Sequence, residues 1–453
     1  MSSKDRFPRR DFLKLTGAAG AGALLAACAA APPAAAPSAS TASGASTGTS
    51  SSGGVLTADA KATINIFNFG GDNDKKIYND AYARFSKKYP NVTINDNFTP
   101  VTTWSEYSNK IATQIAGGKA PDIIHIAIEG MRLLVSKDFL LPVDDLLKSD
   151  SAGKDLIDDI ASGLTEPMKV GGKFYVVPDS WNNMVIHYNT KMFADAKLDP
   201  PKPNWTWDDF LSAAKALTQG EGDKKVWGFG IPYFNFGLTP WWLTNGTYQL
   251  SDDWTQSNLN DPKMLEAVTF VHDLVHVHKV SPDVKGTDPT ALFPAGRMAM
   301  SGWGHWPIQG FLKANFKDFA VQYWPRKTKA TTVIGIGGFG IFKDSQNKEV
   351  AWEIIKELVS RETLQASATA GVAIPARRSV AESKDFLAFP PNSEIFYGCL
   401  KDAKPVASPA NFNELETIFM RHLDEIMTNA TTPDAGLKAA HDELSAAMAK
   451  LKA

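Results

Sequence analysis

Short strand-like segments alternate with amphipathic helical segments from Lys61 onward, and this alternation constrains the fold more than any other feature of the chain. Residues 63–69 predict a strand, and in residues 75–89 apolar side chains recur at helical spacing until Pro90 ends the pattern. A second strand at 92–94, a helix that Ser105 would cap and Gly117 and Gly118 would close, and a buried strand at 122–128 are then expected.

Strands separated by helices indicate the α/β class, with a mainly parallel sheet and helices on both faces. In such sheets, ligands bind beyond the carboxyl ends of the strands. Those ends are followed here by the segment from Asn68 to Asp72 and by Glu129. The sequence therefore predicts a binding site at this edge of the sheet.

The charge of the chain is nearly balanced, with 47 Lys and Arg against 49 Asp and Glu in 453 residues. Residues 1–14 hold five of the cations and two of the anions, which leaves 42 cations and 47 anions, a net charge of −5, for the rest. This balance excludes nucleic acid as an expected partner, and two cysteines exclude a disulfide framework or a Cys-rich metal site. At about 100 to 200 residues per domain, the length predicts at least two lobes.

The N-terminus is typical of a targeting segment, because a basic stretch precedes the short apolar run 15–25. Residues 9–14 (RRDFLK) resemble the twin-arginine export signal, although Pro8 departs from that pattern, and residues 25–28 (LAAC) resemble the bacterial lipobox. The resemblance implies that residues 1–27 are an export signal and that Cys28 is lipidated. An ordinary secretory peptide that happens to end in Cys is the alternative.

Residues 28–60 are almost wholly Ala, Pro, Ser, Thr and Gly, and are expected to form a flexible tether. A lipidated Cys28 would anchor the protein, and the tether would hold its body away from the membrane surface. Cys399 would then be a free thiol. The expected localisation is extracytoplasmic, with the protein attached by lipid to the bacterial cell membrane at the cell surface or in the periplasm.

Three patterns that suggest an enzyme are weak. The G-x-G-x-x-G match at 335–340 continues into strand-like residues rather than a helix, so no nucleotide site is expected. His272 and His276 lie four residues apart but lack a third ligand, so a solvated helix surface is favoured over a zinc site. The adjacent carboxylates at 144–145, 158–159 and 208–209 are interpreted as helix caps or solvated surface. No cofactor, metal or catalytic residue is therefore predicted.

Ten of the twelve tryptophans lie within residues 181–324. Two groups, at 241–242 and 303–306, are surrounded by Gly, Pro, Thr and His in stretches without periodicity. Aromatic side chains in loops are typical of recognition surfaces, and an indole can stack on the C–H face of a sugar ring. These two groups therefore indicate a carbohydrate site, whereas Trp205 and Trp207 flank the cap-like Thr206 at the start of a helix.

Several segments, in this order and spacing, resemble family 1 extracellular solute-binding proteins, the carbohydrate-binding lipoproteins of ATP-binding-cassette (ABC) importers. The resemblance covers nearly all of residues 60–450. The segments that carry it are 120–124, 141–145, 171–178, 187–193, 201–210, 293–300 with Trp306, 337–338, 348–359 and 373–377. Ile126 stands where some maltose binders have an aromatic residue, so maltodextrin specificity does not follow.

This resemblance implies the two-lobed fold of type II periplasmic binding proteins, each lobe a mainly parallel sheet flanked by helices. Lobe 1 would comprise 61–180 and 326–375, and lobe 2 would comprise 181–325 and 376–453. Strands crossing between the lobes would form a hinge at 176–183, 325–338 and 370–378. The protein would capture a mono- or oligosaccharide by lobe closure and deliver it to the permease and ATPase subunits of an ABC importer.

The resemblance also assigns most of the ligand-binding residues, while Trp303 and His305 are added as neighbours of Trp306, and Gly338 as a position where backbone approaches the cleft. The predicted ligand-binding residues are Asn68, Phe69, Asp72, Glu129, Trp181, Asn182, Tyr233, Trp241, Trp242, Trp303, His305, Trp306 and Gly338. The protein is expected to be a monomer and not an enzyme. Two alternatives stay open: a binder of a charged solute such as glycerol 3-phosphate or a polyamine, and a secreted carbohydrate-active enzyme with a carboxyl pair across its cleft.

Overall fold

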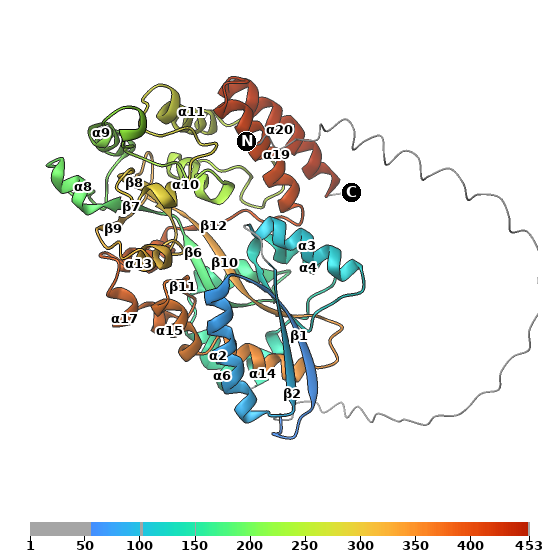
Figure 1. Cartoon of the computed structure of the whole chain (residues 1–453). Helices are drawn as coiled ribbons and strands as arrows, with labels where there is room; N and C mark the ends of the chain where they lie inside the picture. The colour runs from blue at the N-terminus through green and yellow to red at the C-terminus, as the bar shows by residue number, and fades with distance from the viewer. Residues whose placement is uncertain (1–55, 100–102, 150, 452–453) are drawn as a thin grey trace, which may run out of the picture. The chain divides into compact units, whose positions relative to one another are not determined.

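The structure, a computed structural model, describes residues 56–99, 103–149 and 151–451. The predicted export signal, Cys28 and most of the predicted tether lie outside these residues. The described part of the chain is built on two main sheets and a small hairpin (Figure 1).

The larger sheet has the strand order β11-β6-β10-β3-β1-β2, with β12 paired to β10. Strand β1 pairs in parallel with β2 and β3, whereas β10 pairs antiparallel with β3 and β6. The parallel half is the part that the alternation of strands and helices predicts. The strands of the whole larger sheet are β1 (Ala62–Phe69), β2 (Val92–Thr99), β3 (Ile123–Ala127), β6 (Val177–Asn183), β10 (Val333–Ile341), β11 (Ile374–Pro375) and β12 (Lys404–Pro405).

The smaller main sheet has the order β8-β7-β9, and both of its pairings are antiparallel. Parallel pairing in this region is confined to single bridges such as Gly230 with Ser301. The second sheet is thus less parallel than expected, because its central strand β7 is flanked by two strands that run back along it. The strands are β7 (Val185–Asn189), β8 (Met300–Trp303) and β9 (Phe319–Gln322), and the hairpin is β4 (Lys169–Val170) with β5 (Lys173–Phe174).

The chain passes from the larger sheet to the smaller one over a single residue. Strand β6 ends at Asn183, β7 begins at Val185, and only the fully buried Met184 separates them. A connection this short keeps the two sheets adjacent and limits how far they can move apart. The predicted hinge segment 176–183 ends immediately before this crossing residue.

Helices cover both sheets (Figure 1). Helices α2 and α14 pack against each other and against the larger sheet, while α3 and α4 pack against β3 and against α19. Near the larger sheet lie α2 (Asp72–Lys88), α3 (Trp104–Ala116), α4 (Ile128–Ser136), α5 (Asp144–Ser149), α6 (Ser151–Asp158), α7 (Ser162–Thr165), η1 (Glu166–Met168), α14 (Lys348–Leu358), α15 (Arg361–Thr369) and α16 (Arg378–Ala381).

The remaining helices belong to the segments that follow β7 and β11. They are α8 (Thr190–Asp195), α9 (Trp207–Leu217), η2 (Gly222–Lys224), α10 (Asn235–Asn245), α11 (Pro262–His276), α12 (Pro289–Leu292), α13 (Ile308–Lys313), α17 (Lys384–Leu387), α18 (Glu394–Gly398), η3 (Cys399–Lys401), α19 (Phe412–Met427) and α20 (Pro433–Lys450). The antiparallel pair α19 and α20 packs beside α11.

Helix starts follow the local chemistry of the sequence. Thr206 and Asp209 form the capping box at the start of α9, as the sequence indicates, with the Asp209 amide donating to Thr206 Oγ1 at 3.2 Å. The cap of α3 is Thr103 rather than the predicted Ser105, because the Glu106 amide donates to Thr103 Oγ1 at 3.1 Å. This two-residue shift frees the Ser105 hydroxyl for a different contact.

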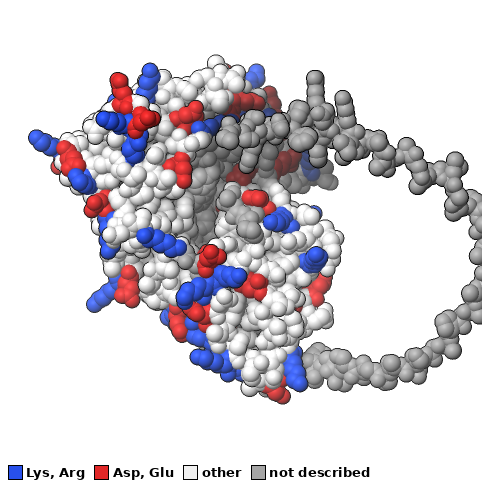
Figure 2. Space-filling view, in the orientation of Figure 1, with Lys and Arg blue, Asp and Glu red and all other residues white. Residues whose placement is uncertain are grey.

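Not every predicted surface carboxylate is solvated. Asp159 accepts a hydrogen bond from Nε of the buried Arg377 at 2.9 Å, and Asp144 accepts one from the Phe174 amide at 2.9 Å. Elsewhere, on the face that Figure 2 shows, basic and acidic side chains are interspersed rather than gathered into a single basic patch.

Candidate functional site

The principal cleft has a volume of about 580 Å³ and is lined by residues from two different parts of the fold. The larger sheet supplies the end of β1, the start of α3, Glu129 on α4, and the middle of β6 and β10. The other side comes from the start of α10, the segment after β8, and α19. The lining residues are Phe69, Thr103, Trp104, Ser105, Glu129, Ser180, Trp181, Asn182, Phe234, Phe236, Trp306, Gly335, Ile336, Gly337, Phe412 and Glu416.

Aromatic rings dominate the walls of this cleft. Phe69 and Trp104 stack with their ring centroids 4.0 Å apart and an interplanar angle of 23°. On the other wall, the Trp306 ring lies 6.2 Å from that of Phe234 and 6.5 Å from that of Phe236. Rings held against one another in this way present fixed apolar faces, on which a flat or cyclic ligand can stack without ordering the side chains first.

Two carboxyl groups lie among these rings. Glu129 is 8% exposed, and burial raises the pKa of its carboxyl from 4.5 to about 8. Its Oε2 is buried and has no hydrogen-bond partner within the described part of the chain. Glu416 accepts a hydrogen bond from the Ser105 hydroxyl, and burial raises its pKa as well. The cleft therefore holds a carboxyl oxygen, Glu129 Oε2, whose hydrogen bond only a bound ligand or solvent could supply.

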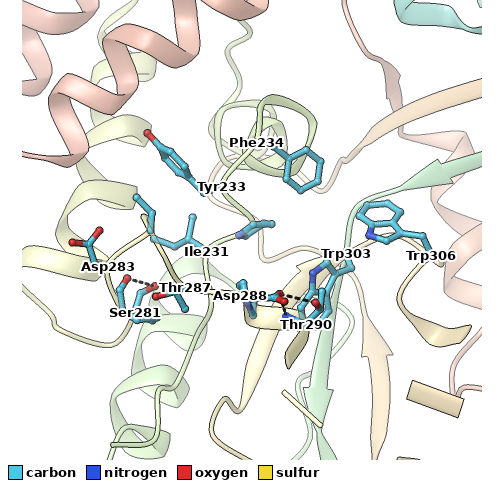
Figure 3. Close-up of a pocket in the computed structure, with 14 residues that line it drawn as sticks. Ile231, Tyr233, Phe234, Ser281, Asp283, Thr287, Asp288, Thr290, Trp303 and Trp306 are labelled. Atoms are coloured by element: carbon cyan, nitrogen blue, oxygen red, sulfur yellow. Dashed lines mark hydrogen bonds between the residues drawn. The ribbon is translucent and has the colours of Figure 1, made fainter. Parts of the chain in front are cut away.

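A second pocket of about 340 Å³ adjoins the cleft and is drawn in Figure 3. Phe234 and Trp306 line both hollows, so they form the boundary between them. Further polar and aromatic groups line the second pocket, among them Tyr233, Ser281, Asp283, Asp288, Thr290 and Trp303. The hydroxyl of Tyr233 donates to Asp424 Oδ1 at 2.8 Å, which fixes the orientation of its ring.

The structure brings seven of the predicted ligand-binding residues to these two hollows. Phe69, Glu129, Trp181 and Asn182 line the cleft, Tyr233 and Trp303 line the second pocket, and Trp306 lines both. Two of them are held by hydrogen bonds from or to backbone: Trp181 Nε1 donates to the Pro375 carbonyl at 3.2 Å, and Asn182 Oδ1 accepts from the His305 amide at 2.8 Å.

Trp241 and Trp242 are the clearest departures from the sequence expectation. Their segment is helix α10 rather than a loop, and both side chains are 0% exposed. Trp241 packs edge-to-face against Trp207 at 5.5 Å, and Trp242 against Phe419 at 5.6 Å. The prediction that they face the ligand is therefore wrong for this conformation. Helix α10 is buried on nearly all sides, so its sequence lacks the periodicity that would reveal a helix.

Four other predicted residues line neither hollow. Asn68 is fully buried, with its Oδ1 2.9 Å from His125 Nδ1, and Asp72 is exposed at the start of α2. His305 is buried and stacks on Phe386 with ring centroids 5.0 Å apart. Gly338 faces strand β6 rather than the cleft, since a Cβ there would lie 2.2 Å from the Val177 carbonyl oxygen.

Sequence reasoning missed Trp104, Phe234, Phe236, Phe412 and Glu416. Trp104 directly precedes the predicted cap Ser105, and the two phenylalanines lie beside Tyr233, so proximity to candidate residues was an available signal. Glu416 gave no such signal, because it sits on an amphipathic helix far along the chain from Glu129. Only the packing of α19 against α3 and α4 brings it to the cleft.

Within the described residues, no cluster of three His, Cys, Asp or Glu side chains could hold a metal ion. His272 and His276 are engaged with the end of α19 rather than open to solvent: His272 Nε2 lies 2.9 Å from Asn429 Oδ1, and His276 Nε2 lies 2.9 Å from the Met427 carbonyl. None of the helices in the described part of the chain is both long and apolar enough to span a membrane.

Comparisons with known proteins agree on one family. The sequence model of the family described as bacterial extracellular solute-binding protein matches residues 70–364. A binding protein of Brucella abortus (strain 2308) is 23% identical over 392 residues, which are 82% of this chain and 90% of that protein. The arabinooligosaccharide-binding protein of Halalkalibacterium halodurans is 22% identical over 249 residues, 54% of each chain.

Solved structures give the same result for the fold. An ABC substrate-binding protein from Listeria monocytogenes, in complex with cycloalternan, matches with a TM-score of 0.78 and 26% sequence identity. The match covers 86% of this chain and 100% of that one. It confirms the two-lobed α/β fold that is expected from the sequence.

Proposed function

Because this chain belongs to the bacterial extracellular solute-binding protein family, we propose that it captures a sugar or oligosaccharide outside the cytoplasm and delivers it to an ABC importer. The observation that carries the proposal is the cleft itself. Stacked rings line it, and between them lies a buried carboxyl with an unsatisfied oxygen. A sugar offers a C–H face for the rings and hydroxyl groups for the carboxyls.

The adjoining pocket supports an oligosaccharide rather than a single sugar. Phe234 and Trp306 border both hollows, so a ligand of more than one ring can pass from one to the other across the same aromatic boundary. The Listeria protein named above was solved with cycloalternan, and the Halalkalibacterium relative is named for arabinooligosaccharides. Neither name fixes the ligand of this chain.

Capture is proposed to proceed by closure of lobes 61–180 with 326–375 and 181–325 with 376–453. A ligand in the cleft touches groups from the larger sheet on one wall and Phe234, Phe236 and Trp306 on the other. It gains both sets of contacts only when the walls approach, so its binding free energy favours the closed form. The short crossing at Met184 is suited to a small hinge rotation.

The test is a titration of intrinsic tryptophan fluorescence against a panel of mono- and oligosaccharides, with product analysis by chromatography. We expect a saturable change for at least one oligosaccharide and no product. Turnover of the sugar would instead support the secreted carbohydrate-active enzyme. Silence toward every sugar would reject the proposed function.

A phosphorylated ligand such as glycerol 3-phosphate is disfavoured by the side chains present. No Lys, Arg or His is among the described residues that line the cleft or the adjoining pocket. Cations are the usual ligands of a phosphate group in proteins, so their absence from the lining weighs against a phosphorylated ligand, whereas the other common phosphate ligands, helix N-terminal amides, are represented by the starts of α3 and α10. The same lining does not exclude a cationic ligand.

Attachment through a lipid on Cys28 is also a proposal, resting on the lipobox-like LAAC at 25–28. We expect the protein to fractionate with membranes and a Cys28→Ser variant to be released or retained as the unprocessed precursor. Immunoblots of membrane and soluble fractions measure this outcome. An unchanged distribution of the variant would contradict lipid anchoring while leaving the sugar site untouched.

A further inference from the structure

All the charged side chains among the described residues that line the two hollows are carboxyl groups. Glu129 and Glu416 line the cleft, and Asp283 and Asp288 line the adjoining pocket (Figure 3). Lys285, which follows the pocket-lining Val284, forms an ion pair with Asp424, with Nζ and Oδ2 3.1 Å apart, and the same carboxylate also holds Tyr233.

Two of the four carboxyl groups have local roles in the fold. Asp288 caps α12 by accepting from the Thr290 amide at 2.9 Å, and Asp283 accepts from the Lys285 amide at 3.0 Å. Glu129 has no such role for its Oε2, which is buried in the cleft without a partner among the described residues. Glu416 accepts one hydrogen bond, from the Ser105 hydroxyl. The cleft pair is therefore the part of the acidic lining with unused capacity for a ligand.

Aromatic faces next to carboxylates form a characteristic environment for organic cations. The negative face of a ring attracts a cation, and a carboxylate forms its strongest hydrogen bonds with a charged donor. Here Trp104, Trp306 and Phe412 line the same cleft as the two glutamates. A neutral sugar would use the rings but would supply no positive charge to the two buried carboxyl groups.

We infer that the preferred ligand is an oligosaccharide bearing free amino groups, with an ammonium held between Glu129 and Glu416 against the aromatic walls. The inference rests on the proposed function and narrows its substrate class. The rings stack on the pyranose faces, and the ammonium supplies hydrogen-bond donors to the unpartnered Oε2 of Glu129 and to Glu416.

The raised pKa of Glu129, about 8, keeps its carboxyl mainly protonated near pH 7 in the chain without a ligand. Burial raises the pKa of Glu129, and the neighbouring Glu416 adds to the rise. Burial raises the pKa of the Tyr248 hydroxyl, and the nearby Glu129 raises it further. No cation offsets these effects in the described surroundings, so a ligand ammonium would supply the missing positive charge and favour ionised carboxylates.

Affinities of the full-length chain, purified in detergent, for four probes test the inference: the glucosamine trimer, the N-acetylglucosamine trimer, maltotriose and spermidine. We expect the glucosamine trimer to bind about tenfold more tightly than its acetylated counterpart at low ionic strength, because a charged hydrogen bond replaces a neutral one. The advantage should shrink as salt is added, although less than for an exposed pair.

Variants separate the charge effect from the rest of the site. Glu129→Gln and Glu416→Gln keep the side-chain size and should each reduce the preference for the amino trimer, and the double variant should abolish it. Glu349→Gln, at an exposed position on α14 that lines neither hollow, is the matched control and should retain the full preference. Circular dichroism and thermal unfolding verify that each variant is folded.

The measured affinities distinguish failure of this inference from failure of the proposed function. Equal affinity for the amino and acetylated trimers overturns the inference, and binding of maltotriose in that case leaves the proposed function intact. Tighter binding of spermidine than of any sugar overturns both the sugar class and the inference. A preference for the amino trimer that survives in the double variant shows that other groups hold the charge and also overturns the assignment to these glutamates.

Discussion

Tryptophans in this protein divide into two roles that their surroundings decide. Trp306 is partly exposed and borders both hollows, whereas Trp241 is fully buried among Trp207, Phe210, Phe229 and Trp324. The two residues have the same chemistry, so only their position separates a ligand-stacking ring from a core ring.

Replacing each tryptophan should therefore affect a different property. Trp306→Ala is expected to weaken sugar binding by about 30-fold, the loss typical of a central aromatic anchor, with little change in stability. Trp241→Ala is expected to lower the free energy of unfolding by about 3 to 5 kcal/mol, because it leaves a large cavity. Fluorescence titration and urea unfolding of both variants measure the two effects. Equal loss of affinity and stability in both would contradict the division.

Glu129 makes the stability of the protein depend on pH. Its pKa is raised from 4.5 to about 8 in the folded chain, so the unfolded chain loses this proton first as the pH rises. The contribution of Glu129 to stability is thus fully present below about pH 4.5 and is lost as the pH rises through 8, by at most about 1.4 kcal/mol per pH unit.

The Glu129→Gln variant lacks this titration and supplies the comparison. We expect the free energy of unfolding of the wild-type chain to fall relative to that of Glu129→Gln between pH 5 and pH 8, measured by urea unfolding without ligand. Glu349→Gln, with an exposed carboxylate on α14, should follow the wild type throughout. Parallel curves for the wild type and Glu129→Gln would show that Glu129 ionises normally.

Among the secondary-structure elements, strand β10 contains two adjacent glycines, Gly337 and Gly338, that differ in how closely neighbouring atoms approach them. At Gly338 a Cβ would lie 2.2 Å from the Val177 carbonyl oxygen and 2.9 Å from Val176 Cγ1, where the pairing of β10 with β6 shifts register. At Gly337 the nearest heavy atoms would lie 3.5 Å away, an ordinary contact. Close packing of the crossing strands, not approach of a ligand, therefore accounts for Gly338.

Alanine at these two positions should give opposite results. Gly338→Ala is expected to destabilise the chain by about 1 to 3 kcal/mol, because the added methyl forces β6 and β10 apart. Gly337→Ala, in the same strand, should change the stability by less than about 1 kcal/mol. Thermal and urea unfolding compare them. A Gly338→Ala variant as stable as Gly337→Ala would mean that the strands yield easily at this point.

At the scale of the whole molecule, the proposed mechanism requires the two walls of the cleft to approach one another. Groups on β1, α4 and β6 face Phe234, Phe236 and Trp306 across it. The connection through Met184 is a single residue between β6 and β7, so closure would be a rotation rather than a rearrangement of loops.

Small-angle X-ray scattering should detect this motion. We expect the radius of gyration to decrease when a saturating oligosaccharide is added to the wild-type chain. Trp306→Ala, at the same sugar concentration, should remain close to the unliganded value because its binding is weakened. No change in the wild type at saturation, confirmed by fluorescence, would argue for a rigid cleft.

Patterns in the amino-acid sequence were enough to predict the α/β class, the first strands and helices, and the family. Each of these depends on local patterns: apolar spacing sets β1 and α2, Thr206 with Asp209 starts α9, and a series of short motifs in fixed order marks the family. The sequence also predicted Phe69 and Glu129 at the edge where the ends of parallel strands meet, and both residues line the cleft.

Which side chains line the cleft depends on tertiary packing. Packing buries Trp241 inside α10 and carries Glu416, on a helix near the C-terminus, to within the same cleft as Glu129. The physical reason is that burial and distance are set by contacts between residues far apart in the chain. A tryptophan or a glutamate has the same local sequence signature whether it faces a ligand, the core or solvent.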